Sequence, residues 1–332
     1  MTPARTRAAL AALIVLCAAR LASAAGCKIE RYPKMPVTLK DMQALISVRI
    51  NGAPAVLAVD SGAFFSVLSP QGARRYHLTR LFTPPGLFLG GLGGVTHPGL
   101  VSARTFTFVH QTLQRVEFLV AGNDSFSRGA GLLGDNLLRM AYVELDFGRG
   151  YMRFVHTAHC GNLPLAYWAG TRPVAVVRFT PSAGGSPRFV ATARRDGHRI
   201  VVLFDTGAGR SMLSLATAER LHIGPGAPGV RSAGRVMGFT HHWVKTWIVP
   251  VARLQIGGET IEHTHIEVVP MTTAGPDSGL VLGTDFFSRT TSTSPTANTK
   301  STSPTAAARC LRSGSPSRRL SPRTLPVRPL PT

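Results

Sequence analysis

Short apolar or alternating stretches, each broken by glycine, proline or asparagine, fill the chain from residue 26 to Phe287. Stretches of this length and periodicity predict β-strands rather than helices. The clearest strands are predicted at residues 45–50, 56–59, 105–109, 116–120, 142–147, 200–204 and 261–269. The pairs Asn51-Gly52, Asp196-Gly197 and Gly257-Gly258 predict hairpin turns, because these residue types tolerate positive φ. The pattern therefore indicates a mainly β structure.

Two short helices are predicted to interrupt the strands. Each opens with a serine that can cap the helix, Ser69 before Pro70 and Ser214 before Leu215, and the second helix is predicted to end near Gly224.

The chain contains an internal duplication. An apolar strand runs into Asp60-Ser61-Gly62-Ala63, and 145 residues later another runs into Asp205-Thr206-Gly207-Ala208. From these aspartates onward, nine of nineteen aligned positions are identical, including Ser66 with Ser211. Each copy then contains a glycine-rich stretch and closes with an apolar run into glycine, at Gly134 and at Gly283. Because the order of elements is the same in both copies, we expect two similar folding units.

The composition changes abruptly at Arg289. Serine, threonine, proline, alanine and arginine follow without periodicity to the end of the sequence. Such a segment buries too little apolar surface to order itself, so residues 289–332 are predicted to be a disordered tail. The second copy is then expected to lack the strands that follow Gly134 in the first, as a truncated or shifted reading frame would explain.

The formal charge of +21 at first suggests nucleic-acid binding. Eight of the basic residues lie after Phe287 and three lie before residue 26, so about +10 remains for the folded part, and it is scattered. We therefore expect no nucleic-acid partner; a basic adaptor that acts through its tail is the less favoured interpretation.

The N-terminus is typical of a signal peptide. Arg5 and Arg7 precede an apolar stretch, and Ala22-Ser23-Ala24 offers a cleavage site, so residues 1–25 predict export to the periplasm or the exterior. Arg20 ends the apolar run well short of the ~20 residues that span a bilayer, which argues against a transmembrane segment.

Two interpretations of Cys27 remain open, and they exclude each other. In an oxidising compartment Cys27 and Cys160 can form a disulfide. Alternatively, Ala24-Ala25-Gly26-Cys27 loosely resembles a bacterial lipoprotein box, in which Cys27 would receive a lipid anchor.

Both motifs, both helices and both apolar-apolar-glycine elements together resemble the retropepsin-like aspartic proteases, in particular the exported bacterial group with Asp-Thr-Gly-Ala motifs. The resemblance covers about residues 40–288. It implies an all-β fold of two similar barrel-like lobes with a catalytic cleft between them. We expect the N-terminal lobe at residues 26–160 and the C-terminal lobe at residues 161–288.

The resemblance implies that Asp60 and Asp205 are the catalytic pair of an aspartic endopeptidase. Two carboxylates in contact cannot both ionise, so one acts as base and the other as acid toward an attacking water. No metal or cofactor is expected in such a mechanism. The function is therefore predicted to be hydrolysis of peptide bonds in a peptide or protein substrate.

The neighbouring residues are expected to support the pair. Gly62 and Gly207 allow backbone amides to approach the carboxylates, and Ser61 and Thr206 resemble the family's hydroxyls that bond to the opposite loop. Ala63 and Ala208 offer no hydroxyl to the carboxylates, so we expect a less acidic optimum than in relatives with serine at these positions.

The first glycine-rich stretch resembles a flap, the mobile hairpin that closes over the substrate. Its expected substrate-binding residues are Gly90, Gly91, Gly93 and Gly94. Residues 234–240, with Gly238, would be the counterpart in the second copy; an ordinary loop is the alternative for both.

The alternative function is a catalytically inactive module that binds extended peptides on the same duplicated scaffold. Because both aspartates lie in one chain, the enzyme is expected to be active as a monomer.

His263, His265 and Glu267 alternate along one predicted strand, as a metal site would require, but a solvated strand face is the preferred interpretation. The sequence does not identify the substrate or its cleavage site.

Overall fold

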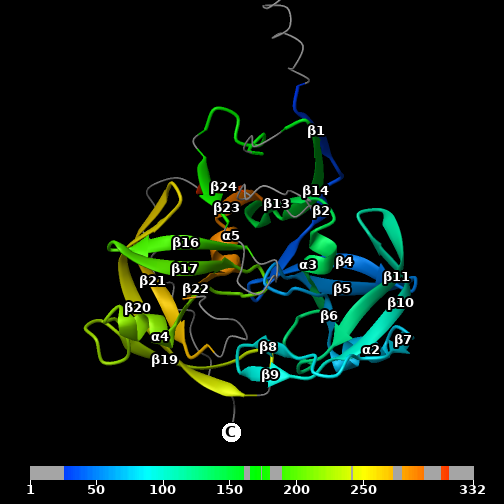
Figure 1. Ribbon diagram of the computed structural model, residues 1–332, viewed down its shortest axis with the longest axis horizontal. Helices are drawn as coiled ribbons and strands as arrows, with labels where there is room; N and C mark the ends of the chain where they lie inside the picture. Colours follow the sequence, from blue (N-terminus) through cyan, green and yellow to red (C-terminus); the bar gives the residue numbers. More distant parts are fainter. Residues whose placement is uncertain are drawn as a thin grey trace, which may run out of the picture.

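The computed structural model describes residues 26–160, 165–172, 174–179, 189–240, 242–271, 279–294 and 308–313. They form two β-barrel lobes, a sheet shared between the lobes and a small hairpin (Figure 1). The short helices lie at the ends of strands. The prediction of an all-β fold with two similar lobes is confirmed.

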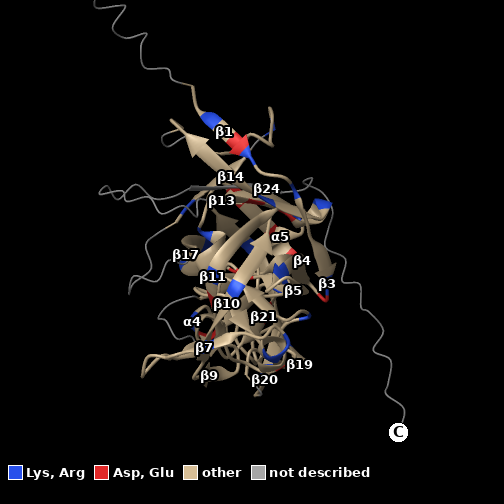
Figure 2. Ribbon diagram, turned by 90° about the vertical axis from the view of Figure 1, so that its right-hand side faces the viewer, with Lys and Arg blue, Asp and Glu red and all other residues tan. Residues whose placement is uncertain are grey.

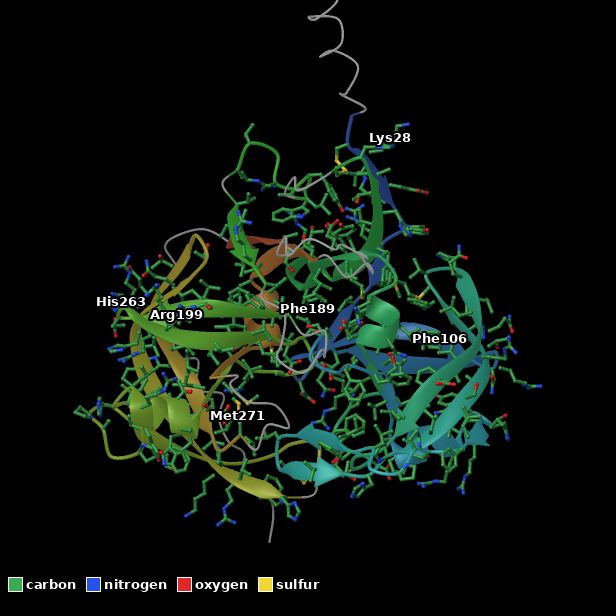
Figure 3. The ribbon with its side chains drawn as sticks, in the orientation of Figure 1. Lys28, Phe106, Phe189, Arg199, His263 and Met271 are labelled. Carbon is green, nitrogen blue, oxygen red and sulfur yellow. A yellow bond between two sulfur atoms is a disulfide. The ribbon has the colours of Figure 1, made fainter. Side chains whose placement is uncertain are left out.

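The first lobe is an eight-stranded sheet that closes through an additional pairing of β4 with β10. Its strands are β3 (Thr38–Lys40), β4 (Gln43–Ile50), β5 (Ala53–Val59), β6 (Val67–Leu68), β7 (Thr79–Leu81), β10 (Gly99–Phe108), β11 (Gln111–Val120) and β12 (Gly131–Leu133). Helices α2 (Pro70–Arg74) and α3 (Asp135–Leu138) follow β6 and β12. Phe106 lies inside this barrel, fully buried against Phe118 (Figure 3).

The second lobe repeats this plan with seven strands, and it closes through β16 and β20. Its strands are β16 (Val190–Arg195), β17 (His198–Phe204), β18 (Met212–Ser214), β19 (Arg231–Met237), β20 (Trp243–Ile256), β21 (Glu259–Val269) and β22 (Leu280–Leu282). Helices α4 (Leu215–Arg220) and α5 (Thr284–Phe287) match α2 and α3.

The local signals in the sequence produced the local structures that they predict. The β4–β5 and β16–β17 turns have positive φ at both central residues, at Asn51 and Gly52 and at Asp196 and Gly197. The Ser69 hydroxyl accepts a hydrogen bond from Gly72 N at 2.9 Å and so caps α2. Ser214 caps α4 in the same way, through Thr217 N.

The third large sheet joins the two lobes and lies at the top of Figure 1. It contains β1 (Lys28–Arg31), β2 (Met35–Pro36), β13 (Tyr142–Asp146), β14 (Tyr151–Ala158), β15 (Ala175–Arg178), β23 (Thr290–Ser294) and β24 (Ala308–Ser313), with the 3₁₀ turn η1 (Phe147–Arg149) between β13 and β14. The expectation that residues 289–332 are a disordered tail is therefore wrong for residues 290–294 and 308–313. Residues 295–307 and 314–332 lie outside the described residues.

Strand β23 also corrects the expectation that the second copy lacks its last strands. It follows α5 as β13 follows α3, and the two strands pair antiparallel at the centre of the sheet. Threonine is polar and so contributed to the prediction of disorder from composition. Its branched Cβ nevertheless favours strands. Two of the buried threonine hydroxyls of β23 have partners: Thr291 Oγ1 donates to Asp146 Oδ2 at 3.1 Å, and Thr293 Oγ1 accepts from Trp168 Nε1 at 2.7 Å.

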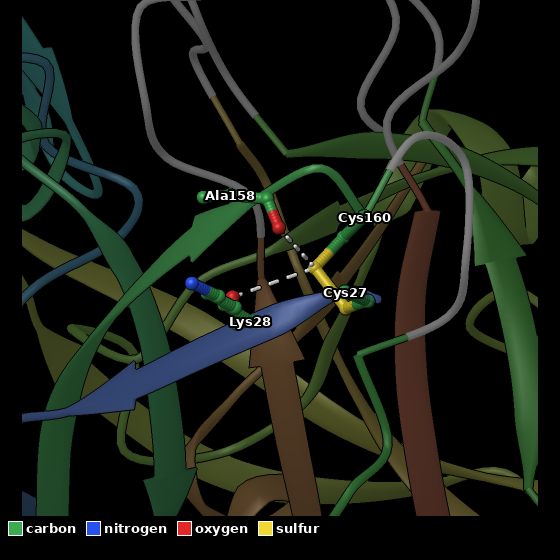
Figure 4. Close-up of a disulfide and its surroundings, with 4 residues drawn as sticks. All are labelled: Cys27, Lys28, Ala158 and Cys160. Carbon is green, nitrogen blue, oxygen red and sulfur yellow. Dashed lines mark hydrogen bonds between the residues drawn. A yellow bond between two sulfur atoms is a disulfide. The ribbon is translucent and has the colours of Figure 1, made fainter. Parts of the chain in front are cut away.

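Cys27 and Cys160 form a disulfide beside the pairing of β1 with β14 (Figure 4). The bond ties the start of the described chain to the end of β14. It occupies the sulfur of Cys27, which a lipid anchor would require, so the structure favours the first of the two interpretations of this residue.

Lys and Arg residues, blue along the ribbon in Figure 2, are spread over several elements. Within the residues that the structure describes, no helix is long and apolar enough to cross a membrane. The predicted signal peptide, residues 1–25, lies outside this part of the chain.

Candidate active site

Equivalent strands position the two aspartates. Asp60 follows β5 and Asp205 follows β17, and the last residues of both strands are buried. The backbone N–H of Asp60 donates to Leu133 O on β12, and that of Asp205 donates to Leu282 O on β22, both at 3.0 Å. The apolar-apolar-glycine elements, β12 and β22, therefore fix the position of each aspartate at the end of its strand.

Backbone amides surround one oxygen of each carboxyl group. Asp60 Oδ1 accepts hydrogen bonds from Gly62 N at 2.9 Å and from Ala63 N at 2.8 Å. Asp205 Oδ1 accepts from Gly207 N at 2.8 Å and from Ala208 N at 3.2 Å. These donors stabilise the ionised form of either side chain.

The two carboxyl groups face each other and are linked by a hydrogen bond. Burial, the negative charge of Asp205 and this hydrogen bond raise the pKa of Asp60 well above its ordinary value, although the Ala63 and Gly62 amides oppose the rise. Asp60 is 9% exposed and Asp205 is half-buried, so the pair keeps limited access to solvent. The arrangement favours one shared proton over two ionised carboxylates.

Glycine is required in both loops by the opposite aspartate. A Cβ atom on Gly62 would overlap the carboxyl group of Asp205, and one on Gly207 would overlap that of Asp60. Each glycine thus makes room for the carboxyl group of the other lobe. The sequence predicted only that these glycines let backbone amides approach the carboxylate of the same loop. The requirement from the opposite lobe is more specific.

Four hydrogen bonds join the loops through Ser61 and Thr206. Ser61 Oγ donates to Phe204 O at 2.9 Å and accepts from Thr206 N at 3.1 Å. Thr206 Oγ1 donates to Val59 O at 2.8 Å and accepts from Ser61 N at 3.0 Å. Because each loop both donates to the other and accepts from it, these hydrogen bonds hold Asp60 and Asp205 in equivalent positions.

A second layer of contacts holds each loop from behind. Ser66 Oγ donates to Asn136 Oδ1 at 2.8 Å and accepts from Gly134 N at 2.9 Å. Ser211 Oγ donates to Asp285 Oδ1 at 2.7 Å and accepts from Gly283 N at 3.1 Å. Sequence reasoning noted the identity of Ser66 and Ser211 without assigning them this role.

The glycine-rich stretch of the first copy forms a hairpin of β8 (Leu89–Gly91) and β9 (Gly94–Thr96). Its counterpart is the hairpin of β19 and β20, whose connecting residues include Gly238, while Gly234 lies within β19. The two hairpin ends meet at the lower centre of Figure 1. Gly91 packs against Phe239, Gly238 packs against Leu92, and Gly93 O lies 3.0 Å from His242 Nδ1.

Asn123 binds the second hairpin end to the first lobe, a role that no pattern in the sequence indicates. Its Nδ2 donates to three successive carbonyl oxygens, those of Gly238, Phe239 and Thr240, at 3.2, 3.2 and 2.7 Å. Its Oδ1 accepts from the N–H and the hydroxyl of Ser125, which orients the amide. Asn123 is only 3% exposed.

We expect Asn123→Ala to free the end of the β19–β20 hairpin. The loss of the Nδ2 contacts with the three carbonyl oxygens should increase amide exchange in residues 238–240 by about tenfold. Hydrogen exchange of these residues tests the effect. Asn123→Asp keeps the shape but loses the donors, so it should act at least as strongly; unchanged exchange in both variants would contradict this role.

No three His, Cys, Asp or Glu side chains gather to hold a metal ion in the described part of the chain. This holds for His263, His265 and Glu267, which lie on β21.

The family model described as Aspartyl protease matches residues 46–141 and again residues 191–286, together more than half of the chain. The protein belongs to the aspartyl protease family. Each matched stretch covers one aspartate with its loop and the strand beneath it, so each lobe contains one copy of the family's unit.

Among solved structures, the aspartic proteinase from Irpex lacteus is similar to this family member with a TM-score of 0.50 and 12% sequence identity. The match covers 87% of this chain and 98% of that chain. At this identity the likeness shows the fold alone. A search of curated protein sequences gives no match.

Proposed function

We propose that the protein is an aspartic endopeptidase in which Asp60 and Asp205 together activate water. The observation that supports this most directly is the contact of the two carboxyl groups, with the raised pKa of Asp60 that results from it. Aspartic proteases are the standard example of two carboxyl groups that share one proton. Membership of the family and the reciprocal bonds between the loops support the same conclusion.

In this proposal the pair divides the work of acid and base. The ionised carboxylate takes a proton from water as the water oxygen attacks the peptide carbonyl carbon. The protonated carboxyl group donates to the carbonyl oxygen, and a proton then passes to the leaving nitrogen as the C–N bond breaks. The pair titrates as a unit, so the two roles are not assigned to individual aspartates.

The substrate would be an extended peptide held between the aspartates and the two hairpin ends. Residues 89–96 and Gly238 would cover it on the side opposite the carboxyl pair, as a flap does. Since one chain contributes both aspartates and both hairpins, we expect a monomer to be active.

The inactive peptide-binding module remains the alternative. A second copy without its last strands would be a reason for caution about the peptidase, and β23 and β24 remove that reason. Export is proposed from the N-terminal pattern, and the Cys27–Cys160 disulfide supports it because such bonds persist in oxidising compartments.

The test is to incubate the chain from residue 26 onward with a mixed peptide library between about pH 3.5 and 7.5 and to identify products by mass spectrometry. Cleavage at internal bonds is the expected result. Retention of uncut peptides on the protein, without products at any pH in this range, would favour the binding module and refute the peptidase.

A further inference from the structure

Asp135 is a buried carboxyl group that the proposed reaction does not use. It is the first residue of α3 and is 1% exposed. Within the described residues, no group donates a hydrogen bond to either of its side-chain oxygens. The nearest cation, Arg139, has its Nε at 3.9 Å from Oδ2. A buried carboxylate without donors is costly, so its surroundings require an explanation.

The internal duplication supplies a reference for this position, since Asp135 is the equivalent of Thr284. Asp135 N donates to Ala63 O at 2.8 Å, and Thr284 N donates to Ala208 O at 2.7 Å. The preceding glycines donate in the same way to Ser66 Oγ and Ser211 Oγ. The backbones of α3 and α5 therefore approach their active-site loops in the same manner.

In the second lobe the side chain at this position has a clear role. Thr284 Oγ1 donates to Thr206 O at 2.8 Å and is fully buried. That bond fixes the carbonyl of the residue that directly follows Asp205. The equivalent carbonyl in the first lobe belongs to Ser61, which directly follows Asp60.

We propose that Asp135 is a positioning residue for Asp60: its neutral carboxyl group donates to Ser61 O, as Thr284 donates to Thr206 O, and ionisation breaks this bond. The idea rests on the proposed function for its catalytic consequence. One active-site loop is then held by a hydroxyl that does not titrate and the other by an acid that does.

Burial raises the pKa of Asp135 from 3.8 to about 7, and Arg139 opposes the rise. Residues 61–66, which bind the backbone of α3, and β12, which precedes it, contain no titratable side chain, and Asp60 directly precedes this loop. The folded chain thus binds this proton more tightly than the unfolded chain. The resulting stabilisation is complete below about pH 4 and is lost as the pH rises through about 7.

Hydrogen exchange of the two loops, measured on the chain from residue 26 onward without substrate, tests the proposal. Between pH 6 and 8.5 the protection of residues 58–66, corrected for intrinsic rates, should fall by roughly tenfold. Residues 203–211, held by Thr284, serve as the internal control and should change by less than about twofold.

Two variants separate positioning from general stability. Asp135→Thr copies the second lobe, and Asp135→Asn keeps a donor without a charge, so residues 58–66 should stay protected at every pH in both. The proposal is overturned if the two loops respond alike in the native chain, or if both variants lose protection at high pH as the native chain does. Because no turnover is measured, a protein that cleaves no peptide still gives a decisive result.

Discussion

Replacing Asp60 or Asp205 by asparagine is expected to lower kcat/KM for peptide cleavage by about 10³-fold or more. Asparagine keeps the shape of the side chain and still accepts from the loop amides that surround Oδ1. It cannot take a proton from water, and it removes the shared proton on which the acid and base roles depend. Initial rates on a peptide identified in the library experiment measure the effect.

The control for these variants is Asp196→Asn. Asp196 lies in the β16–β17 turn at positive φ, where asparagine is equally suited, and it is remote from the pair. This change should leave the rate within about twofold. Thermal unfolding of Asp60→Asn should occur no lower than in the native chain, because burial and Asp205 already disfavour the charge. If Asp60→Asn or Asp205→Asn keeps a tenth of the native rate, the carboxyl group at that position does not have the proposed role.

Local patterns in the sequence were sufficient to predict much of the site. A buried strand, an aspartate and a glycine recur in the same order, and the recurrence predicts two equivalent loops in two similar folding units. Asn51-Gly52 and Ser69 act within a few residues of themselves, so their turn and cap could be predicted without knowledge of the fold. These features depend on backbone conformation over short distances.

Contacts between distant segments were beyond such patterns. Asn123 lies 115 residues before the first carbonyl that it binds, and nothing near it in the sequence indicates that partner. Strand β23 is rich in serine and threonine, and only its place beside β13 explains why it is buried. For the same reason no pattern in the sequence indicates a role for aspartate at position 135, although its equivalent is threonine.

These contacts also show how far the two lobes depend on each other. Each active-site loop is bonded to the other loop through Ser61 and Thr206, and β13 and β23 pair at the centre of the shared sheet. The carboxyl groups of Asp60 and Asp205 meet because the two barrels are joined both by the hydrogen bonds between the loops and by the shared sheet. A change that separates the loops should therefore abolish activity without unfolding either barrel.

Gly207→Ala is such a change, and we expect it to lower kcat/KM by about 10²-fold or more. Gly207 has no positive φ, so alanine is compatible with the backbone, and the effect arises from the overlap of its Cβ with the carboxyl group of Asp60. The added Cβ would lie 2.2 Å from Asp60 Cγ, so relief requires a movement of about 1 Å, which breaks the contact of the two carboxyl groups. The cost in the free energy of unfolding should be about 1–3 kcal/mol, typical of overpacking.

Gly62→Ala should act in the same way, because its Cβ would overlap Asp205. Gly99→Ala is the matched control: Gly99 also lacks positive φ, and the nearest atom to its added Cβ is Val120 Cβ at 4.0 Å. This variant should keep native kinetics and stability. If Gly207→Ala and Gly62→Ala cleave peptides at the rate of Gly99→Ala, the two carboxyl groups do not need their close contact, and the shared proton cannot be the basis of the reaction.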